Sequence, residues 1–203
     1  MVKGALFELL FASWPTLVIF LVIIILLRLF YYKNSSKKLI LHEEILLLVF
    51  VTYILLLFEL VTNRDVYSGT NLVPFREILR YNIGSSNFYK QVLGNIVLFV
   101  PFGFFASYYT KINKIRSITL ITFLVSLTIE IVQIYIGRSF DIDDIILNIV
   151  GGVLGFLIYV GLDAIGKKLP SFMTSDLFLS FLSILVLGLF VLYLLGIVNL
   201  GWL

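Results

Sequence analysis

The side chains most suited to chemistry lie at a short turn between two long apolar runs. Glu130 and Gln133, before the turn, are three residues apart and would share one face of a helix. After the turn, Asp141, Asp144 and Asn148 fall at i, i+3 and i+7, which places them on one stripe of the next helix. Oxygen atoms grouped in this way can exchange protons, hold a hard cation or hydrogen-bond a polar ligand.

The composition of the chain is that of an integral membrane protein. Of its 203 residues, 61% are hydrophobic and 13% are charged, and the mean hydropathy is +1.09. Soluble domains are about 45–50% apolar and about 25% charged. The apolar runs are continuous, which predicts helices rather than a barrel, whose strands alternate in polarity over ~10 residues. Because a charged side chain within the bilayer costs about 2.5–3.5 kcal/mol, a retained polar cluster indicates a function.

The apolar runs predict an all-α polytopic membrane protein, a bundle of about six transmembrane helices. The expected spans are residues 9–30, 45–61, 92–109, 117–136, 144–162 and 177–198. Within the fifth span, Gly151 and Gly155 have the small-xxx-small spacing that allows two helices to approach closely.

A long polar connection, residues 62–92, separates the second and third spans. Loops of about 30 residues in compact proteins are usually functional or disordered. Phe75, Ile78, Leu79 and Ile83 recur at helical spacing within it, which predicts a short amphipathic helix on the membrane surface.

The basic residues near the helix ends predict the orientation of the chain. One set of alternate loops carries Arg28, Lys33, Lys37, Lys38, Lys111, Lys114, Arg116, Lys167 and Lys168, and the other carries Lys3, Arg64, Arg76, Arg80, Lys90 and Arg138. The larger set is expected in the cytoplasm. Both termini, the 62–92 loop and the polar turn would then be extracytoplasmic.

The residue types that are rare or missing exclude several classes of site. The chain has no cysteine, which excludes disulfides, thiolate metal sites and cysteine nucleophiles. The single histidine, His42, excludes metal motifs with two histidines, and beside Glu43 and Glu44 we expect it to be solvated in a loop. The net charge of +3 is spread over the loops, so nucleic acid is not an expected partner.

Further polar groups converge on the outer end of the helices. Asn95 is expected at about the depth of Glu130, and Arg76, Arg80 and Arg138 lie in the neighbouring loops. A guanidinium group binds phosphate or carboxylate through a bidentate fork. Carboxylate and amide oxygens are the ligands of Mg²⁺ and Ca²⁺. We therefore expect a pocket for an anionic amphiphile, such as a membrane lipid, a lipid-linked cell-wall precursor or an acylated glycopeptide, with a divalent cation as a candidate cofactor.

Four motifs in this order resemble the VanZ-like family: NLVPF at 71–75, GNIVLFVPFG at 94–103, EIVQ at 130–133 and RSFDIDDIILNIVGG at 138–152. The resemblance covers about residues 45–160, which divides the chain into an N-terminal helix and loop at 1–44, a core at 45–165 and a C-terminal helix at 166–203. The family is named for an accessory protein linked to glycopeptide resistance, chiefly to teicoplanin. The predicted ligand-binding residues are Asn71, Arg76, Asn95, Glu130, Gln133, Arg138, Asp141, Asp144 and Asn148.

Three functions remain open from the sequence. The first, which the resemblance favours, is a protein that binds or shields a lipid-anchored ligand and lowers susceptibility to teicoplanin-type antibiotics. The second is an intramembrane enzyme in which Glu130 accepts a proton and Asp141 or Asp144 acts as acid or metal ligand. The third is a structural role, in which hydrogen bonds among Glu130, Asn95 and Asn148 hold three helices together. A transporter would need acidic groups in the inner half of the helices, which the sequence lacks.

Overall fold

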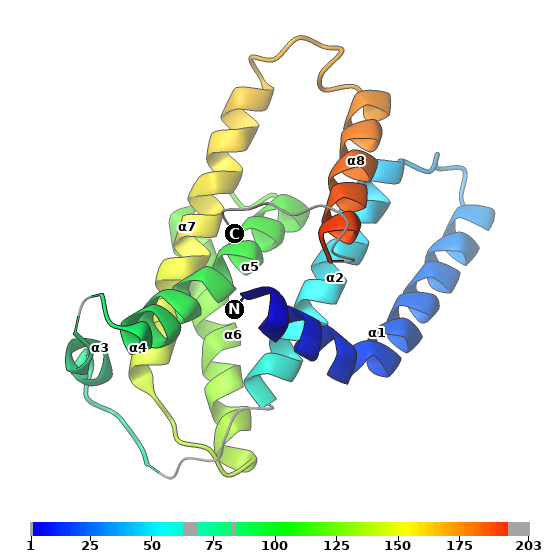
Figure 1. The fold of residues 1–203 in the computed structure, drawn as a ribbon. Coiled ribbons are helices and arrows are strands. Elements are labelled where there is room, and N and C mark those ends of the chain that lie inside the picture. Colours follow the sequence, from blue (N-terminus) through cyan, green and yellow to red (C-terminus); the bar gives the residue numbers. More distant parts are fainter. Residues whose placement is uncertain (1, 63–68, 83, 195–203) are drawn as a thin grey trace. The chain divides into compact units, whose positions relative to one another are not determined.

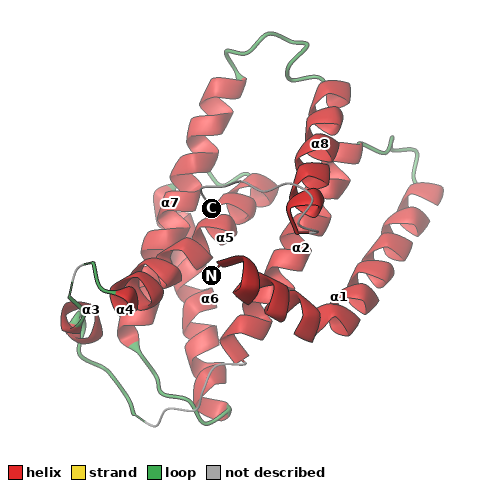
Figure 2. Cartoon of the chain, viewed as in Figure 1, coloured by secondary structure: helices red, strands yellow, loops and turns green. Residues whose placement is uncertain are grey.

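The computed structural model describes residues 2–62, 69–82 and 84–194 (Figure 1). Throughout these residues the regular secondary structure is helical, as predicted (Figure 2). The chain forms two compact units, and the second comprises residues 60–167. The first unit contains α1, most of α2 and α8. The second helix, which the sequence division assigns to the core at 45–165, therefore groups with the first and last helices.

Five helices in the described part of the chain are long and apolar enough to cross a membrane. They are Trp14–Lys33, Leu41–Leu60, Ser86–Thr110, Ile115–Tyr135 and Ile142–Gly166. These cover the first five predicted spans, and the chain is a multi-pass membrane protein. The sixth predicted span forms α8 (Asp176–Leu194), but residues 195–198 of that prediction lie outside the described residues.

The first unit joins α1 (Val2–Lys33) to α2 (Leu41–Thr62) through a polar contact between apolar helices. Arg28 Nε donates a hydrogen bond to Glu44 Oε2 at 2.7 Å, and the hydroxyl of Tyr32 donates to Glu44 Oε1 at 2.8 Å. These bonds satisfy the Glu44 carboxylate, which would otherwise be an uncompensated charge at the start of an apolar helix.

The prediction of a solvated His42 is wrong. Because α2 begins at Leu41, four residues before the predicted span, His42 lies in its first turn and is only 8% exposed. Its backbone nitrogen donates to Ser180 Oγ of α8 at 3.3 Å. The apolar pattern alone missed this because the polar start of the helix interrupts it.

The second unit places several short helical segments before its long helices. Its elements are α3 (Arg76–Arg80), α4 (Ser86–Phe88), the π-helix η1 (Tyr89–Leu93), α5 (Gly94–Thr110), α6 (Ile115–Tyr135) and α7 (Ile142–Gly166). The π-helix continues directly into α5, so the third span begins before the predicted one. Residues 63–68 of the predicted loop, with Arg64, and Ile83 lie outside the described residues.

Glycines set the distance between α5 and α7. A Cβ atom on Gly103 would lie 1.9 Å from the carbonyl oxygen of Gly152, and one on Gly155 would lie 2.0 Å from that of Val100. On Gly151 it would lie 2.1 Å from a carbonyl oxygen of α5. The small-xxx-small prediction is therefore confirmed: backbone meets backbone here, as in close membrane helix pairs.

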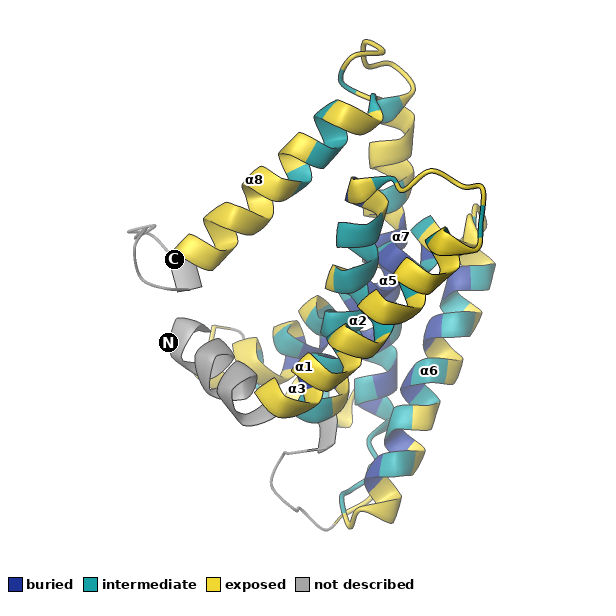
Figure 3. Cartoon of the chain, turned by 90° about the vertical axis from the view of Figure 1, so that its right-hand side faces the viewer, coloured by how far each residue is buried: buried dark blue, intermediate teal, exposed yellow. Residues whose placement is uncertain are grey.

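Helix α6 buries a polar stripe at four-residue spacing. Thr122, Ser126 and Glu130 are each at most 1% exposed, and Gln133 continues the stripe at 5%. Figure 3 shows buried residues along α6 and α7. The prediction that Glu130 and Gln133 share one face holds, and that face is turned into the protein rather than to lipid.

Candidate functional site

The turn between α6 and α7 fixes the first part of the site. Gly137 has a φ of 82°, a left-handed conformation that glycine adopts without strain, and Arg138 N donates to the carbonyl of Gln133 at 2.8 Å. Asp141 is the N-cap of α7, and its Oδ1 accepts from the backbone nitrogen of Asp143 at 2.9 Å. The two helices therefore leave the turn as antiparallel neighbours.

The loop carrying Asn71 pairs with this turn through one isolated parallel bridge. Asn71 N donates to the carbonyl of Phe140 at 2.8 Å, and Ile142 N donates to the carbonyl of Asn71 at 3.1 Å. The side-chain amide of Asn71 also donates to Asp141 Oδ1 at 2.9 Å. Two motifs that are 70 residues apart in sequence thus meet as one structural unit.

Asp143 joins α3 to the start of α7. Its Oδ1 accepts from the backbone nitrogen of Phe75 at 2.5 Å, and its Oδ2 accepts from those of Glu77 at 2.7 Å and Ile78 at 3.2 Å. The residue is 1% exposed. Phe75 has a φ of 66°, which is unusual for a residue with a side chain. One buried carboxylate therefore satisfies three backbone donors at the start of α3.

Sequence reasoning missed Asp143, although one signal was present. The predicted stripe of Asp141, Asp144 and Asn148 lies on a different face of α7 from Asp143. The available signal lay in α3, whose N-cap position is Phe75, a side chain that cannot accept a hydrogen bond. A helix start without its own cap needs an acceptor from elsewhere in the fold.

Glu130 stabilises the turn between α6 and α7 through hydrogen bonds. Its Oε2 accepts from the backbone nitrogen of Asp141 at 2.8 Å. The amide of Gln133, oriented to satisfy both neighbours, donates to Glu130 Oε1 at 3.0 Å and accepts from Arg138 Nη1 at 2.7 Å. Both carboxylate oxygens of Glu130 are thus occupied by groups that hold the turn in place.

The other two buried amides have separate partners. Asn95 Nδ2 donates to Asp144 Oδ1, which connects α5 with α7. Asn148 Nδ2 donates to Ser126 Oγ at 2.8 Å, which connects α7 with α6. The predicted hydrogen bonds directly among Glu130, Asn95 and Asn148 are not the ones formed, because each of these side chains finds its partner at a different level of the helices.

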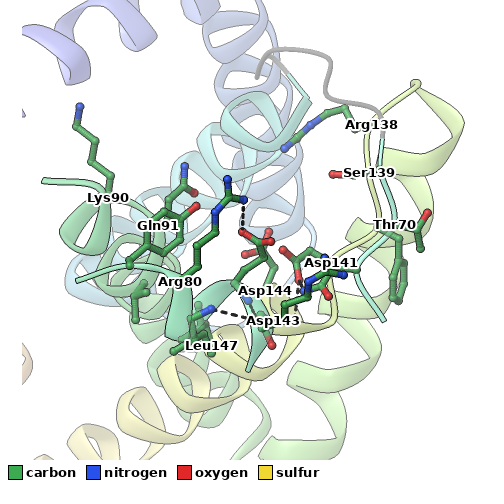
Figure 4. A pocket seen from close by; sticks show the side chains of 18 residues that line it. Thr70, Arg80, Lys90, Gln91, Arg138, Ser139, Asp141, Asp143, Asp144 and Leu147 are labelled. Carbon is green, nitrogen blue, oxygen red and sulfur yellow. Dashed lines mark hydrogen bonds and ion pairs between the residues drawn. The ribbon is translucent and has the colours of Figure 1, made fainter. Parts of the chain in front are cut away.

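A cavity of about 1060 Å³ lies next to these residues, between the loop that carries Asn71, the π-helix η1 and the start of α7 (Figure 4). It is lined by Gly69, Thr70, Asn71, Arg76, Glu77, Ile78, Arg80, Tyr81, Lys90, Gln91, Val92, Arg138, Ser139, Phe140, Asp141, Asp143, Asp144 and Leu147. Ligand sites usually measure about 300–1,000 Å³, so the cavity is large enough for a polar head group.

Five of the nine predicted ligand-binding residues line this cavity: Asn71, Arg76, Arg138, Asp141 and Asp144. The other four, Asn95, Glu130, Gln133 and Asn148, are not among the lining residues. They are buried behind it and hold the turn and the helices. The structure therefore separates the predicted set into a group that faces the cavity and a group that supports it.

Two comparisons with known proteins bear on this chain. The sequence profile of the VanZ/LLP1 family matches residues 14–165. The chain belongs to the VanZ/LLP1 family. A relative described as Protein VanZ, from Enterococcus faecium, is 32% identical over 146 residues, which are 68% of this chain and 83% of that protein. No solved structure matches the chain.

The VanZ/LLP1 match includes the whole site. It extends from within α1 nearly to the end of α7, and so begins earlier in the chain than the four motifs that resemble the family. All residues that line the cavity or support it lie inside the match, whereas α8 lies outside it. The cavity is thus part of the region that makes the chain a family member.

The cavity carries both signs of charge. Arg76, Arg80 and Lys90 are exposed, and Arg80 Nη1 forms an ion pair with Glu77 Oε2 at 3.2 Å. Burial raises the pKa of the Asp141 carboxyl above its usual value, and burial likewise raises the pKa of the Tyr81 hydroxyl. The cations therefore reach solvent, whereas Asp141 lies deeper.

The carboxylates are used mainly within the protein. Those of Asp141, Asp143 and Asp144 accept hydrogen bonds from Asn71, from backbone donors and from Asn95. Among the described residues, no group of three or more His, Cys, Asp or Glu side chains could hold a metal ion. The exposed cationic side chains are suited to hydrogen bonding and charge recognition of an anion.

Proposed function

We propose that this VanZ/LLP1 family member binds the anionic head group of a lipid-anchored ligand, or an acylated glycopeptide, in the cavity, and so lowers susceptibility to teicoplanin-type antibiotics. The observation that carries the proposal is the set of exposed cations, Arg76, Arg80 and Lys90, around a cavity of about 1060 Å³. Family membership supports the link to antibiotics, because the Enterococcus faecium relative is named Protein VanZ.

The position of the cavity supports a ligand that is itself anchored in the membrane. The lining includes residues at the start of α7 and Lys90 and Gln91 at the start of the third span. A site at the ends of two spans lies near the level of the lipid head groups. The distribution of Lys and Arg between alternate loops supports placing this end outside the cell.

The chemistry of the lining favours phosphate or carboxylate groups. Arginine offers a planar fork of donors that matches these anions, and lysine adds a point charge. Arg138 is already oriented by Gln133, so it would lose little conformational freedom when a ligand binds. The carboxylates of Asp141 and Asp143 already accept hydrogen bonds within the protein, which leaves the exposed cations to contact the anion.

A second candidate function, a lipid-modifying enzyme, is supported by one observation. Burial raises the pKa of Asp141, and a carboxyl group with a raised pKa is suited to general acid–base work. Glu130, the predicted proton acceptor, is not among the cavity-lining residues, and its two oxygens accept hydrogen bonds from the backbone of Asp141 and the side chain of Gln133. Catalysis would thus depend on Asp141 and Asp144.

Antibiotic susceptibility in a Gram-positive host tests the proposed function. Teicoplanin and vancomycin tolerance would be measured with the wild type, Arg76→Gln, Arg138→Gln and Arg116→Gln at matched membrane levels. Arg116 is exposed on α6 and does not line the cavity, so it is the matched control. We expect wild type and Arg116→Gln to raise teicoplanin tolerance and the two cavity variants to lose that effect. Full tolerance with both cavity variants would exclude the cavity as the site.

A second measurement separates binding from catalysis. Envelope lipids from cells with wild type, Asp144→Asn or no protein would be compared by mass spectrometry. A binding protein leaves their covalent structure unchanged. A lipid species that appears only with the wild type and disappears with Asp144→Asn would favour the enzyme.

A further inference from the structure

We propose that residues 71–80, here called the docking segment, insert their apolar side chains into the head-group layer of a membrane rich in anionic lipid. Four large apolar side chains of this segment are exposed: Leu72 at 65%, Val73 at 56%, Phe75 at 53% and Leu79 at 81%. The cavity alone would not require such exposure, and the proposal does not depend on what the cavity binds.

The docking segment has two different faces. Arg76, Glu77, Ile78 and Arg80 line the cavity, whereas Leu72, Val73, Phe75 and Leu79 are not among its lining residues. The predicted amphipathic helix is therefore corrected in one respect, because Ile78 faces the cavity and does not share the exposed side with Leu79. The apolar face of the docking segment is thus separate from the face that lines the cavity.

The place where the docking segment is attached determines its level relative to the membrane. Asp143, the second residue of the α7 span, holds the backbone nitrogens of Phe75, Glu77 and Ile78. Asn71 is paired with Asp141, the residue just before that span. A segment fixed at the end of a membrane span lies at the boundary between hydrocarbon and water.

The charge of the docking segment identifies the kind of membrane it fits. Arg76 and Arg80, on the cavity face, are both exposed, and with Glu77, which pairs with Arg80 at 3.2 Å, they leave the segment with a net charge of +1 (two arginines and one glutamate). Apolar side chains flanked by arginines are typical of segments that lie in the interface of anionic membranes. Fixed by Asp143, the segment would enter the head-group layer as a preformed unit rather than fold there.

Spin labels on single cysteines test this insertion, because the native chain has no cysteine. Labels at Leu72 and Leu79 would be compared with a label at Asn113, an exposed residue of the turn between α5 and α6. In vesicles of phosphatidylcholine with phosphatidylglycerol, the ratio of collisions with oxygen to collisions with a water-soluble nickel chelate reports depth. We expect this ratio to be severalfold higher at Leu72 and Leu79 than at Asn113. Equal ratios would overturn the proposal.

The same samples show whether lipid or a second copy of the chain covers the apolar face of the docking segment. Replacing Arg76 and Arg80 by glutamine should lower the ratio at Leu79 in vesicles with phosphatidylglycerol and change it little in phosphatidylcholine alone. A ratio independent of both the arginines and the anionic lipid would refute the role of charge. Dipolar broadening between labels at Leu79 would indicate a second copy as the occupant and overturn the lipid assignment. Because susceptibility is measured separately, failure here leaves the proposed cavity function untouched.

Discussion

The substitution Asp143→Asn should open the docking segment although it hardly changes the size of the side chain. Both carboxylate oxygens of Asp143 accept hydrogen bonds, one from Phe75 and one from both Glu77 and Ile78. An asparagine offers a single oxygen. If that oxygen keeps the pair of donors, the amide nitrogen faces the nitrogen of Phe75, and two donors then oppose each other.

The size of the effect follows from these contacts. A hydrogen bond to a charged group contributes about 1.5–3 kcal/mol, against about 0.5–1.5 kcal/mol for a neutral pair. Losing one charged bond and reducing two others to neutral ones should cost about 3.5–6 kcal/mol in the free energy of docking. At about 1.4 kcal/mol per factor of ten, the open form would become roughly 300-fold to 20,000-fold more populated.

Limited trypsin digestion in detergent measures this opening, since Arg76 and Arg80 lie in the docking segment. Cleavage after these arginines should be faster by a similar factor in Asp143→Asn. The matched control is the neighbouring Asp144→Asn, whose side chain accepts a hydrogen bond from Asn95 of α5. A cleavage rate in Asp143→Asn equal to that of the wild type, or matched by Asp144→Asn, would refute the reasoning.

Three other predictions concern packing, pH and orientation. Gly152→Ala should abolish accumulation of the folded protein, since the new Cβ would lie 2.4 Å from a buried threonine hydroxyl, whereas Gly161→Ala, with nothing within 4 Å, should behave as wild type in membrane yield and melting temperature. Burial raises the pKa of Asp141, so its contribution to stability is fully present below about pH 4 and is lost as the pH rises through the folded-state pKa. The melting temperature of the wild type should therefore fall relative to that of Asp141→Asn as the pH rises above about 4. A membrane-impermeant maleimide on intact cells should label a cysteine at Asn82 and not one at Asn113, and the reverse would invert the proposed orientation.

The membrane helices could be predicted from the sequence because their cause is local. Continuous apolar runs give the spans, and the spacing of Gly151 and Gly155 correctly indicates a close helix contact. The shared face of Glu130 and Gln133 also follows from helical geometry and is confirmed by their burial. Periodicity thus tells which side chains share a face and at which end of a helix they lie.

Partners across the fold could not be predicted in the same way. Asp143 accepts from backbone nitrogens, and the sequence signals only that the start of α3 lacks a cap of its own, not which side chain supplies the acceptor. The expected depth of Glu130 in the membrane makes it a candidate proton acceptor. In the structure, however, its oxygens accept hydrogen bonds from the backbone of Asp141 and the side chain of Gln133. His42 was assigned to a loop because the apolar pattern begins after the helix does. For Asp143 and His42 a contact from a distant segment decided the role of the residue, and for Glu130 it was the backbone of the turn that follows its own helix.

The π-helix before α5 makes the wall of the cavity depend on residue count as well as residue type. Lys90, Gln91 and Val92, which line the cavity, lie within Tyr89–Leu93, where each turn holds more residues than in an α-helix. Because a π turn holds one extra residue within about the same rotation, deleting Gln91 would allow an α-helical turn to form with little change in the direction of Lys90 relative to Asn95. The deletion would remove one lining residue from the cavity while the bond from Asn95 to Asp144 is kept. A length change of one residue at this position would thus alter the site without changing any side chain that supports it.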